Sequence, residues 1–223
     1  MSSSSKVESV VLELVKEYLV KKTFFSIEDI VVFINNRVKW NPNLNKNSIE
    51  RIIKSLIKKR IIVPGTKLMK NNIIENPKRN EIFNYIKNYP SNINEIMKAL
   101  NIGSNQALWH LSCLEKFQFI RSKKIENRRL FFKFDSNPKL DDLFYYLKID
   151  NVQKIISFMI TENKPLKITE IVTGVKKNHN TVKKYVDALN RLKLIKIERI
   201  KNRIVYKIEV KNYSKARKSI RGA

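Results

Sequence analysis

The segment NTVKKYVDAL, residues 180–189, has two counterparts earlier in the chain: NSIERIIKSL at 47–56 and NQALWHLSCL at 105–114. Each begins with Asn, ends with Leu and has apolar residues at its third and seventh positions. Because a helix repeats every 3.6 residues, this spacing places the apolar side chains on one face. Each segment is therefore predicted to be an amphipathic helix with that face buried.

The opposite face of each predicted helix carries polar and cationic side chains. These are Asn47, Arg51, Lys54 and Lys58 in the first copy, Asn105, Trp109, Ser112 and Lys116 in the middle copy, and Asn180, Lys184, Asp187 and Arg191 in the third. Asn can bond to base edges and Lys or Arg to phosphates, so such a face fits a DNA groove. The alternative is an ordinary surface helix whose charged face is solvated. The recurrence of a polar face in all three copies favours DNA binding over that alternative.

Charge indicates the class of partner. The 223 residues include 46 Lys and Arg against 20 Asp and Glu, a formal net charge of +26. Such an excess repels itself unless a polyanion neutralises it, so nucleic acid is the first candidate and an anionic membrane surface the second. The apolar stretch at 10–20 is too short and too charged to span a membrane, and MSSSSK before it lacks a signal peptide's apolar region. We expect a cytoplasmic protein without membrane contact.

The composition also argues against catalysis. One Cys and two His provide neither an internal disulfide nor a Cys-built metal site, and four Gly leave little material for a phosphate-binding loop. Cys113 corresponds to Ser55 and Ala188 in the other copies, which indicates tight packing. His110 is expected to be structural, and His179 either to contact a phosphate or to cap a helix. We expect no enzyme activity, no metal and no cofactor.

Three domains follow from the repeat. The first, 1–74, has a helix at 7–23, a second starting after Ser26, a third from Asn47, and a short strand at 61–67 broken by a Pro-Gly turn. The apolar side of the first helix is expected to comprise Val10, Val11, Leu14, Val15 and Tyr18. Its wing is short or broken.

The second domain, 75–137, repeats this order with a β-hairpin after the third helix. Its strands are expected at 117–124 and 128–134, with Glu126 and Asn127 in the turn and cations around it. A linker helix comes next at 138–150, with Leu140, Leu143, Phe144 and Leu147 on one face. It is either a packing spacer or a self-association surface, which leaves monomer and homodimer open.

The third domain, 151–210, has expected helices at 152–163, 168–175 and 179–194, with Gly174 in a turn. A hairpin at 195–210 closes at Lys201 and Asn202. From residue 151 onward there are 19 basic and five acidic residues. The basic tail, 211–223, is expected to be mobile, and either to lie along DNA or only to aid solubility.

The segments ALNIGSNQALWHLSCLEKFQFIR (99–121), NHNTVKKYVDALNRLKLIKI (178–197) and, more loosely, NKNSIERIIKSLIKKRII (45–62) resemble the recognition helix and first wing strand of archaeal ArsR- and MarR-type transcription regulators. Tandem chains of this kind include activators of the archaellum operon. The resemblance implies a mainly α fold with small β-hairpin wings, in three tandem winged helix-turn-helix domains.

Site residues follow from the resemblance together with the predicted faces. Expected DNA contacts are Asn47, Ser48, Arg51, Lys54, Asn105, Gln106, Trp109, Lys123, Lys124, Arg128, Arg129, His179, Asn180, Thr181, Lys183, Lys184, Arg191, Lys201 and Arg203. The leading hypothesis is a sequence-specific double-stranded DNA-binding transcription regulator, with the basal transcription machinery as a further candidate partner. A winged-helix assembly scaffold or polymerase accessory factor, and a non-specific chromatin or RNA binder, are the alternatives.

Overall fold

The computed structural model describes residues 3–22, 26–39, 44–200 and 202–221. The chain forms two compact units, one of residues 1–122 and 129–134 and the other of residues 123–128 and 135–223. Residues 123–128, the tip of a β-hairpin, thus belong to the second unit, whereas the base of its strands belongs to the first.

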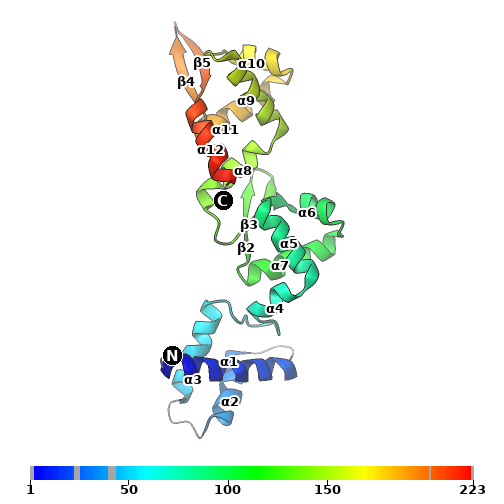
Figure 1. The fold of residues 1–223 in the computed structure, drawn as a ribbon, viewed down its shortest axis with the longest axis vertical. Coiled ribbons are helices and arrows are strands. Elements are labelled where there is room, and N and C mark those ends of the chain that lie inside the picture. Colours follow the sequence, from blue (N-terminus) through cyan, green and yellow to red (C-terminus); the bar gives the residue numbers. More distant parts are fainter. Residues whose placement is uncertain (1–2, 23–25, 40–43, 201, 222–223) are drawn as a thin grey trace. The chain divides into compact units, whose positions relative to one another are not determined.

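Two helix triplets make up most of unit 1 (Figure 1). Its helices are α1 (Ser3–Lys21), α2 (Ile27–Arg37), α3 (Lys46–Lys58), α4 (Lys70–Glu75), α5 (Pro77–Asn88), α6 (Ile93–Leu100) and α7 (Ser104–Lys116). α1, α2 and α3 contact one another, and so do α5, α6 and α7. Each triplet has its own hydrophobic core. A short β1 (Ser91–Asn92) pairs antiparallel with β3 (Arg128–Lys133), which neighbours β2 (Ile120–Ile125).

Polar caps fix several helix starts in unit 1. The Ser26 hydroxyl accepts the Asp29 N–H at 3.1 Å, which confirms the predicted start of α2. Asn45 caps α3, and Asn76 caps α5 with Pro77 in its first turn. Asn92 and Glu95 form a reciprocal capping box on α6. These side chains satisfy N–H groups that the first turn of a helix leaves without partners.

Three expectations for unit 1 need correction, and two short elements were missed. α1 begins and ends earlier than the predicted 7–23, and Val10 on its expected apolar side is 39% exposed. The strand expected at 61–67 is reduced to a single bridge between Ile62 and Met69. α4 and β1 were not predicted, because six and two residues are too short to show a period.

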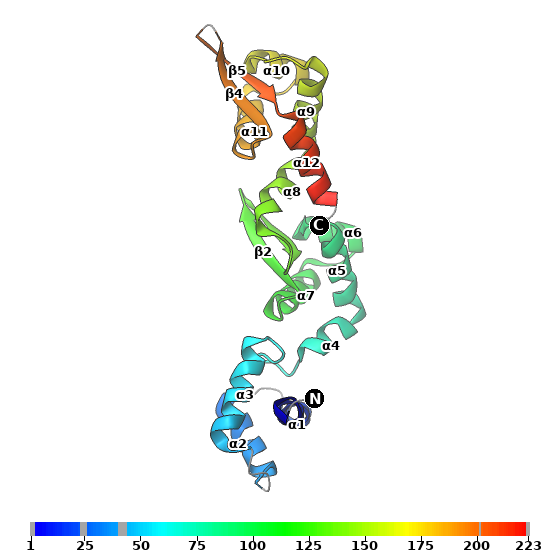
Figure 2. The same ribbon diagram turned by 60° about the vertical axis from the view of Figure 1, so that its left-hand side comes forward.

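Unit 2 contains the third triplet and the second hairpin, which projects beyond the helices (Figure 2). Its elements are η1 (Pro138–Leu140), α8 (Asp141–Leu147), α9 (Asp150–Glu162), α10 (Ile168–Val175), α11 (His179–Arg191), β4 (Ile195–Ile200), β5 (Arg203–Ile208) and α12 (Val210–Arg221). α9, α10 and α11 contact one another, and β4 pairs antiparallel with β5 in the predicted hairpin.

Two predictions in unit 2 were wrong. Gly174 lies inside α10 and not in a turn, at a place where a Cβ would clash with the Phe158 ring. The tail was expected to have no fixed structure, but its described part forms α12, with Tyr213 and Ala216 buried and the helix in contact with α8. Both corrections come from packing against residues distant in sequence.

The repeat is confirmed by burial. The third, seventh and tenth positions of the three decamers are at most 2% exposed, and these nine residues are Ile49, Ile53, Leu56, Ala107, Leu111, Leu114, Val182, Val186 and Leu189. The three helices also end alike, since Arg60, Gln118 and Lys193 adopt left-handed φ angles of 56–58°. The residue after each donates its N–H to the carbonyl of the decamer's last Leu at 2.9 Å. Such a bond closes a helix and reverses the chain.

Candidate nucleic-acid interface

The outward face of α3 carries the residues predicted for it. Asn47, Arg51 and Lys54 are exposed, while Ser48 is half-buried and donates its hydroxyl to the Asn45 carbonyl at 2.8 Å. Lys54 pairs with Glu50 at 2.5 Å. Arg51 has no carboxylate partner among the described residues, so its guanidinium is available to an outside anion.

The outward face of α7 is amide and aromatic. Asn105 and Gln106 are exposed at its N-terminal end. Leu108 and Trp109 are 51% and 58% exposed, although large apolar side chains are usually buried. The Arg79 guanidinium lies 5.4 Å from the centroid of the Trp109 ring, within the range of a cation–π contact. α7 therefore offers fewer phosphate-binding groups than α3 or α11.

Behind α7 lies a buried polar cluster. Arg79 is 5% exposed and donates from Nη1 to Cys113 Sγ at 3.0 Å. His110 is 4% exposed, and burial together with the positive charges of Arg79 and Lys78 lowers the pKa of its imidazole. His110 is thus a neutral residue of the helix interior, as expected from the sequence. Cys113 packs against α5, in agreement with the small residues at its counterparts.

The N-terminal turn of α11 is open to solvent. His179 and Asn180 are exposed and Thr181 is half-buried. Asn178 caps the helix, accepting the Asn180 N–H at 2.8 Å. The capping role considered for His179 is therefore wrong, and a phosphate contact stays a prediction.

Lys183, one turn further along α11, is turned towards the second hairpin. Its ammonium donates to the Asp187 carboxylate at 2.8 Å and to the Tyr206 hydroxyl of β5 at 3.1 Å. These two hydrogen bonds raise the pKa of Lys183 despite partial burial. Lys183 thus joins the helix to its hairpin, a structural role that does not require DNA.

Cations predicted for the first wing have different surroundings. Arg129, in unit 1, pairs with Glu115 of α7 at 2.7 Å. In unit 2, Lys123 pairs with Asp142 of α8 at 2.9 Å. Lys124 and Arg128 are exposed. Ile125 between them is only 6% exposed, so the tip is packed and not free.

Glu126, at the turn of this hairpin, is the centre of a polar cluster within unit 2 comprising Glu126, Tyr145, Tyr146 and Lys184, called here the Glu126 cluster. Its carboxylate accepts hydrogen bonds from the Tyr145 hydroxyl at 3.2 Å, the Tyr146 hydroxyl at 3.0 Å and the Lys184 ammonium at 2.8 Å. One carboxylate thus holds groups from α8 and α11.

Electrostatics in the Glu126 cluster follow from these bonds. Burial acts to raise the pKa of Glu126, but the hydrogen bonds from Lys184, Tyr146 and Tyr145 outweigh it, and the net effect lowers the pKa. Burial, followed by the negative charge of Glu126, raises the pKa of Tyr145 to about 12. The pKa of Tyr146 is raised for the same reasons, although the nearby guanidinium of Arg191 opposes the change. At neutral pH, Glu126 is therefore charged and both tyrosines are neutral donors.

The second hairpin has a different tip. Arg203 is exposed, and Lys201 lies outside the described residues. Ile197, Ile200 and Ile204 are 40%, 46% and 51% exposed. This tip is thus apolar as well as basic.

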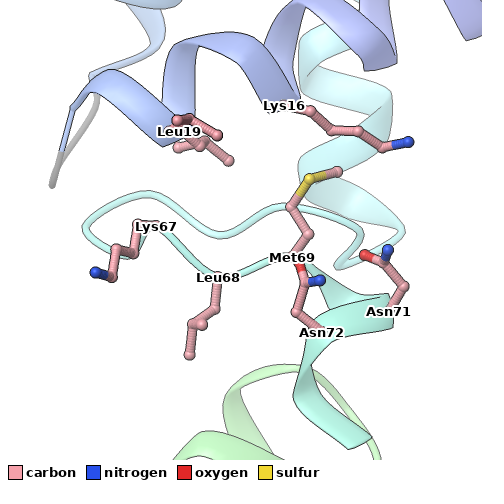
Figure 3. Close-up of a pocket in the computed structure, with 8 residues that line it drawn as sticks. Lys16, Leu19, Lys67, Leu68, Met69, Asn71 and Asn72 are labelled. Carbon is pink, nitrogen blue, oxygen red and sulfur yellow. The ribbon is translucent and has the colours of Figure 1, made fainter. Parts of the chain in front are cut away.

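A pocket of about 480 Å³ lies between α1 and residues 67–72 in unit 1 (Figure 3). Leu19 and Met69 provide apolar surface, while the ammonium groups of Lys16 and Lys67 point away from each other. Ligand sites need polar groups that converge on the ligand. The pocket lacks that convergence.

Neither a metal cluster nor a membrane span is present in the described part of the chain. These residues contain no group of three His, Cys, Asp or Glu side chains placed to hold a metal ion. None of the helices they form combines the length and apolar character needed to cross a membrane.

Sequence reasoning missed Glu126, Tyr145 and Tyr146 as residues of this surface. The turn position of Glu126 was predicted, but its partners lie 19, 20 and 58 residues away. A signal was present: helical spacing places both tyrosines away from the face expected to be apolar, that of Leu140, Leu143, Phe144 and Leu147.

Comparison with known proteins found a relative but no matching family model. The chain is 29% identical over 208 residues to an uncharacterized HTH-type transcriptional regulator of Methanocaldococcus jannaschii. The alignment covers 90% of this chain and 52% of that protein, so the chain spans about half the length of the curated relative it matches.

Proposed function

We propose that the chain is a double-stranded DNA-binding transcription regulator built from three tandem winged helix-turn-helix domains, 1–74, 75–137 and 151–210. The observation that carries the proposal is the threefold recurrence of one helix, with its apolar face buried and an amide-bearing face exposed. The HTH-type regulator among known proteins supports it. The third helix of each triplet would enter the major groove, and exposed wing cations would contact the backbone.

Selection of bound fragments from a random duplex pool tests this function. Sequence-specific binding enriches a motif. An asymmetric motif is expected, because the three outward faces differ. Duplex binding without a motif would favour the chromatin or RNA alternative, and no binding would refute the proposal. Control of a particular operon, such as that of the archaellum, stays a prediction.

Substitutions in α11 then assign the contacts. Replacing Lys184 and Arg191 together with Ala is expected to weaken binding to every duplex. The slope of log affinity against log salt concentration should fall in magnitude by about 2, because two phosphate contacts are lost. The matched control replaces Lys154 and Lys164, two cations outside α11 that pair with Asp150 and Glu162. Asn180→Ala should instead reduce discrimination at one base pair, by about 1–3 kcal/mol. Equal effects of the α11 and control pairs would refute the placement of α11.

A second candidate role concerns the middle triplet. Exposed Leu108 and Trp109 are typical of protein interfaces, where Trp often provides much of the binding energy. A protein contact, for example with the basal transcription machinery, predicts that Trp109→Ala leaves duplex affinity unchanged. A DNA contact predicts weaker duplex binding by the same variant.

A further inference from the structure

The Glu126 cluster places an acidic group on the proposed DNA-binding face of α11. Lys184 lies on the exposed stripe of this helix, yet its ammonium is bonded to the Glu126 carboxylate at 2.8 Å. The side chain of Glu126 is 25% exposed and that of Lys184 is 52% exposed. Lys184 is therefore partnered but still accessible to solvent and to a competing anion.

The backbone of Glu126 has the conformation of a tight hairpin turn, as does that of Asn202 in the second hairpin. The φ angle of Glu126, 52°, lies in the left-handed region, which residues other than Gly adopt rarely. The turn is nevertheless held in place by its surroundings, because Ile125 is buried and Lys123 pairs with Asp142. These contacts bring the carboxylate to Lys184.

A second cation of α11 lies near the same cluster. Arg191 is close enough to Tyr146, itself a donor to Glu126, to oppose the rise in the pKa of its hydroxyl. The middle of the α11 stripe is thus occupied by a group from the same chain, while His179 and Asn180 at its start stay exposed. A carboxylate and a DNA phosphate both bind ammonium groups through anionic oxygens, so they compete for Lys184.

We propose that Glu126 is an autoinhibitory contact, which occupies Lys184 in the free protein and must be displaced by a phosphate when duplex DNA binds along α11. This inference rests on the proposed function. Displacement frees the Lys184 ammonium for a phosphate, while Lys124 and Arg128, which are already exposed, stay available to flanking phosphates. DNA affinity is thereby limited by an internal anion and increases when that anion is removed.

The test is the affinity of the full-length chain for a 30-base-pair duplex carrying the selected motif, measured by fluorescence anisotropy at low salt. Glu126→Gln removes the charge and keeps one oxygen, which can accept the hydrogen bond of Tyr145 or of Tyr146, since their hydroxyls bond to different oxygens of the carboxylate. We expect roughly threefold to tenfold tighter binding, of the order set by releasing one partly exposed ion pair. The control, Glu162→Gln, removes the same charge from a comparable pair with Lys164, and is expected to change affinity by less than about twofold.

A third variant separates competition from a general charge effect. When Lys184 is already replaced by Ala, Glu126→Gln is expected to increase DNA affinity no more than Glu162→Gln does, because the ammonium for which carboxylate and phosphate compete is absent. A gain that persists in the absence of Lys184 would overturn the inference. Unchanged or weaker binding by Glu126→Gln alone would also overturn it, since Glu126 would then position Lys184 for DNA.

Failure of the proposed function gives a different result. If neither the natural chain nor Glu126→Gln binds any duplex, the proposed function fails and this inference fails with it. If the natural chain binds its selected motif and Glu126→Gln matches the Glu162→Gln control, only the inference fails.

Discussion

The two hairpins of this chain have the same plan but different tips. Both have six-residue strands, and both follow a helix that ends in a left-handed residue, Gln118 in one case and Lys193 in the other. Ile125 and Ile200 are the last residues of their first strands, yet the former is 6% exposed and the latter 46%. The first tip also receives Asp142 and two tyrosines from α8, which bond to Lys123 and Glu126. Local sequence therefore determines a hairpin, whereas its surroundings determine which groups are available.

The equivalent isoleucines should respond most differently to truncation. Ile125→Ala removes buried methyl and methylene groups, and we expect it to lower the free energy of unfolding by about 2–3 kcal/mol. Ile200→Ala removes a side chain at an exposed site, and should change the free energy of unfolding by less than about 0.5 kcal/mol. Urea unfolding followed by circular dichroism measures both. Equal losses would show that the two tips are equally packed.

The shared helix ends should respond alike. Gln118 and Lys193 have positive φ angles, which favour Gly because it has no Cβ. Gln118→Gly and Lys193→Gly are each expected to raise the free energy of unfolding, by about 0.5–1 kcal/mol. Asn190→Gly, inside α11, is the control and should lower it by about 1 kcal/mol. Thermal unfolding distinguishes these outcomes, and destabilisation by Gly at either turn would argue against the common helix ending.

The smallest expected effect is the pH dependence of the anchored tip. Because the pKa of Glu126 is lowered below its usual 4.5, its contribution to stability is present above that value. It is lost as the pH falls through the lower folded-state pKa. Between about pH 6 and about pH 8, the free energy of unfolding of the natural chain should exceed that of Glu126→Gln by a constant amount of at most about 1 kcal/mol. Urea titrations across pH 3–8 should show this difference shrinking below pH 4.5; growth on acidification would contradict the assigned pKa direction.

Much of the architecture could be predicted from the sequence because it depends on local periodicity. The nine buried decamer positions, both hairpins and the Ser26 cap all follow from spacing within about a dozen residues. Among candidate site residues, the exposure of Asn47, Asn105 and Asn180 follows from the same helical period. These features need no knowledge of distant contacts.

Features that depend on distant contacts could not be predicted. The tail forms a helix because Tyr213 and Ala216 are buried, although its five cations suggested mobility. Lys184 was expected to face only an outside partner, but Glu126, 58 residues earlier, occupies it. Charge and periodicity identify which cations lie on a face. They do not reveal which of those cations already have an internal partner.

Amide hydrogen exchange of the full-length chain, with and without the selected duplex, tests the central claim most directly. If the outward faces of α3, α7 and α11 bind duplex DNA, exchange should slow in the N-terminal turns of these helices, most strongly in α11. Protection confined to other elements, or no protection at a duplex concentration that saturates binding, would contradict the account.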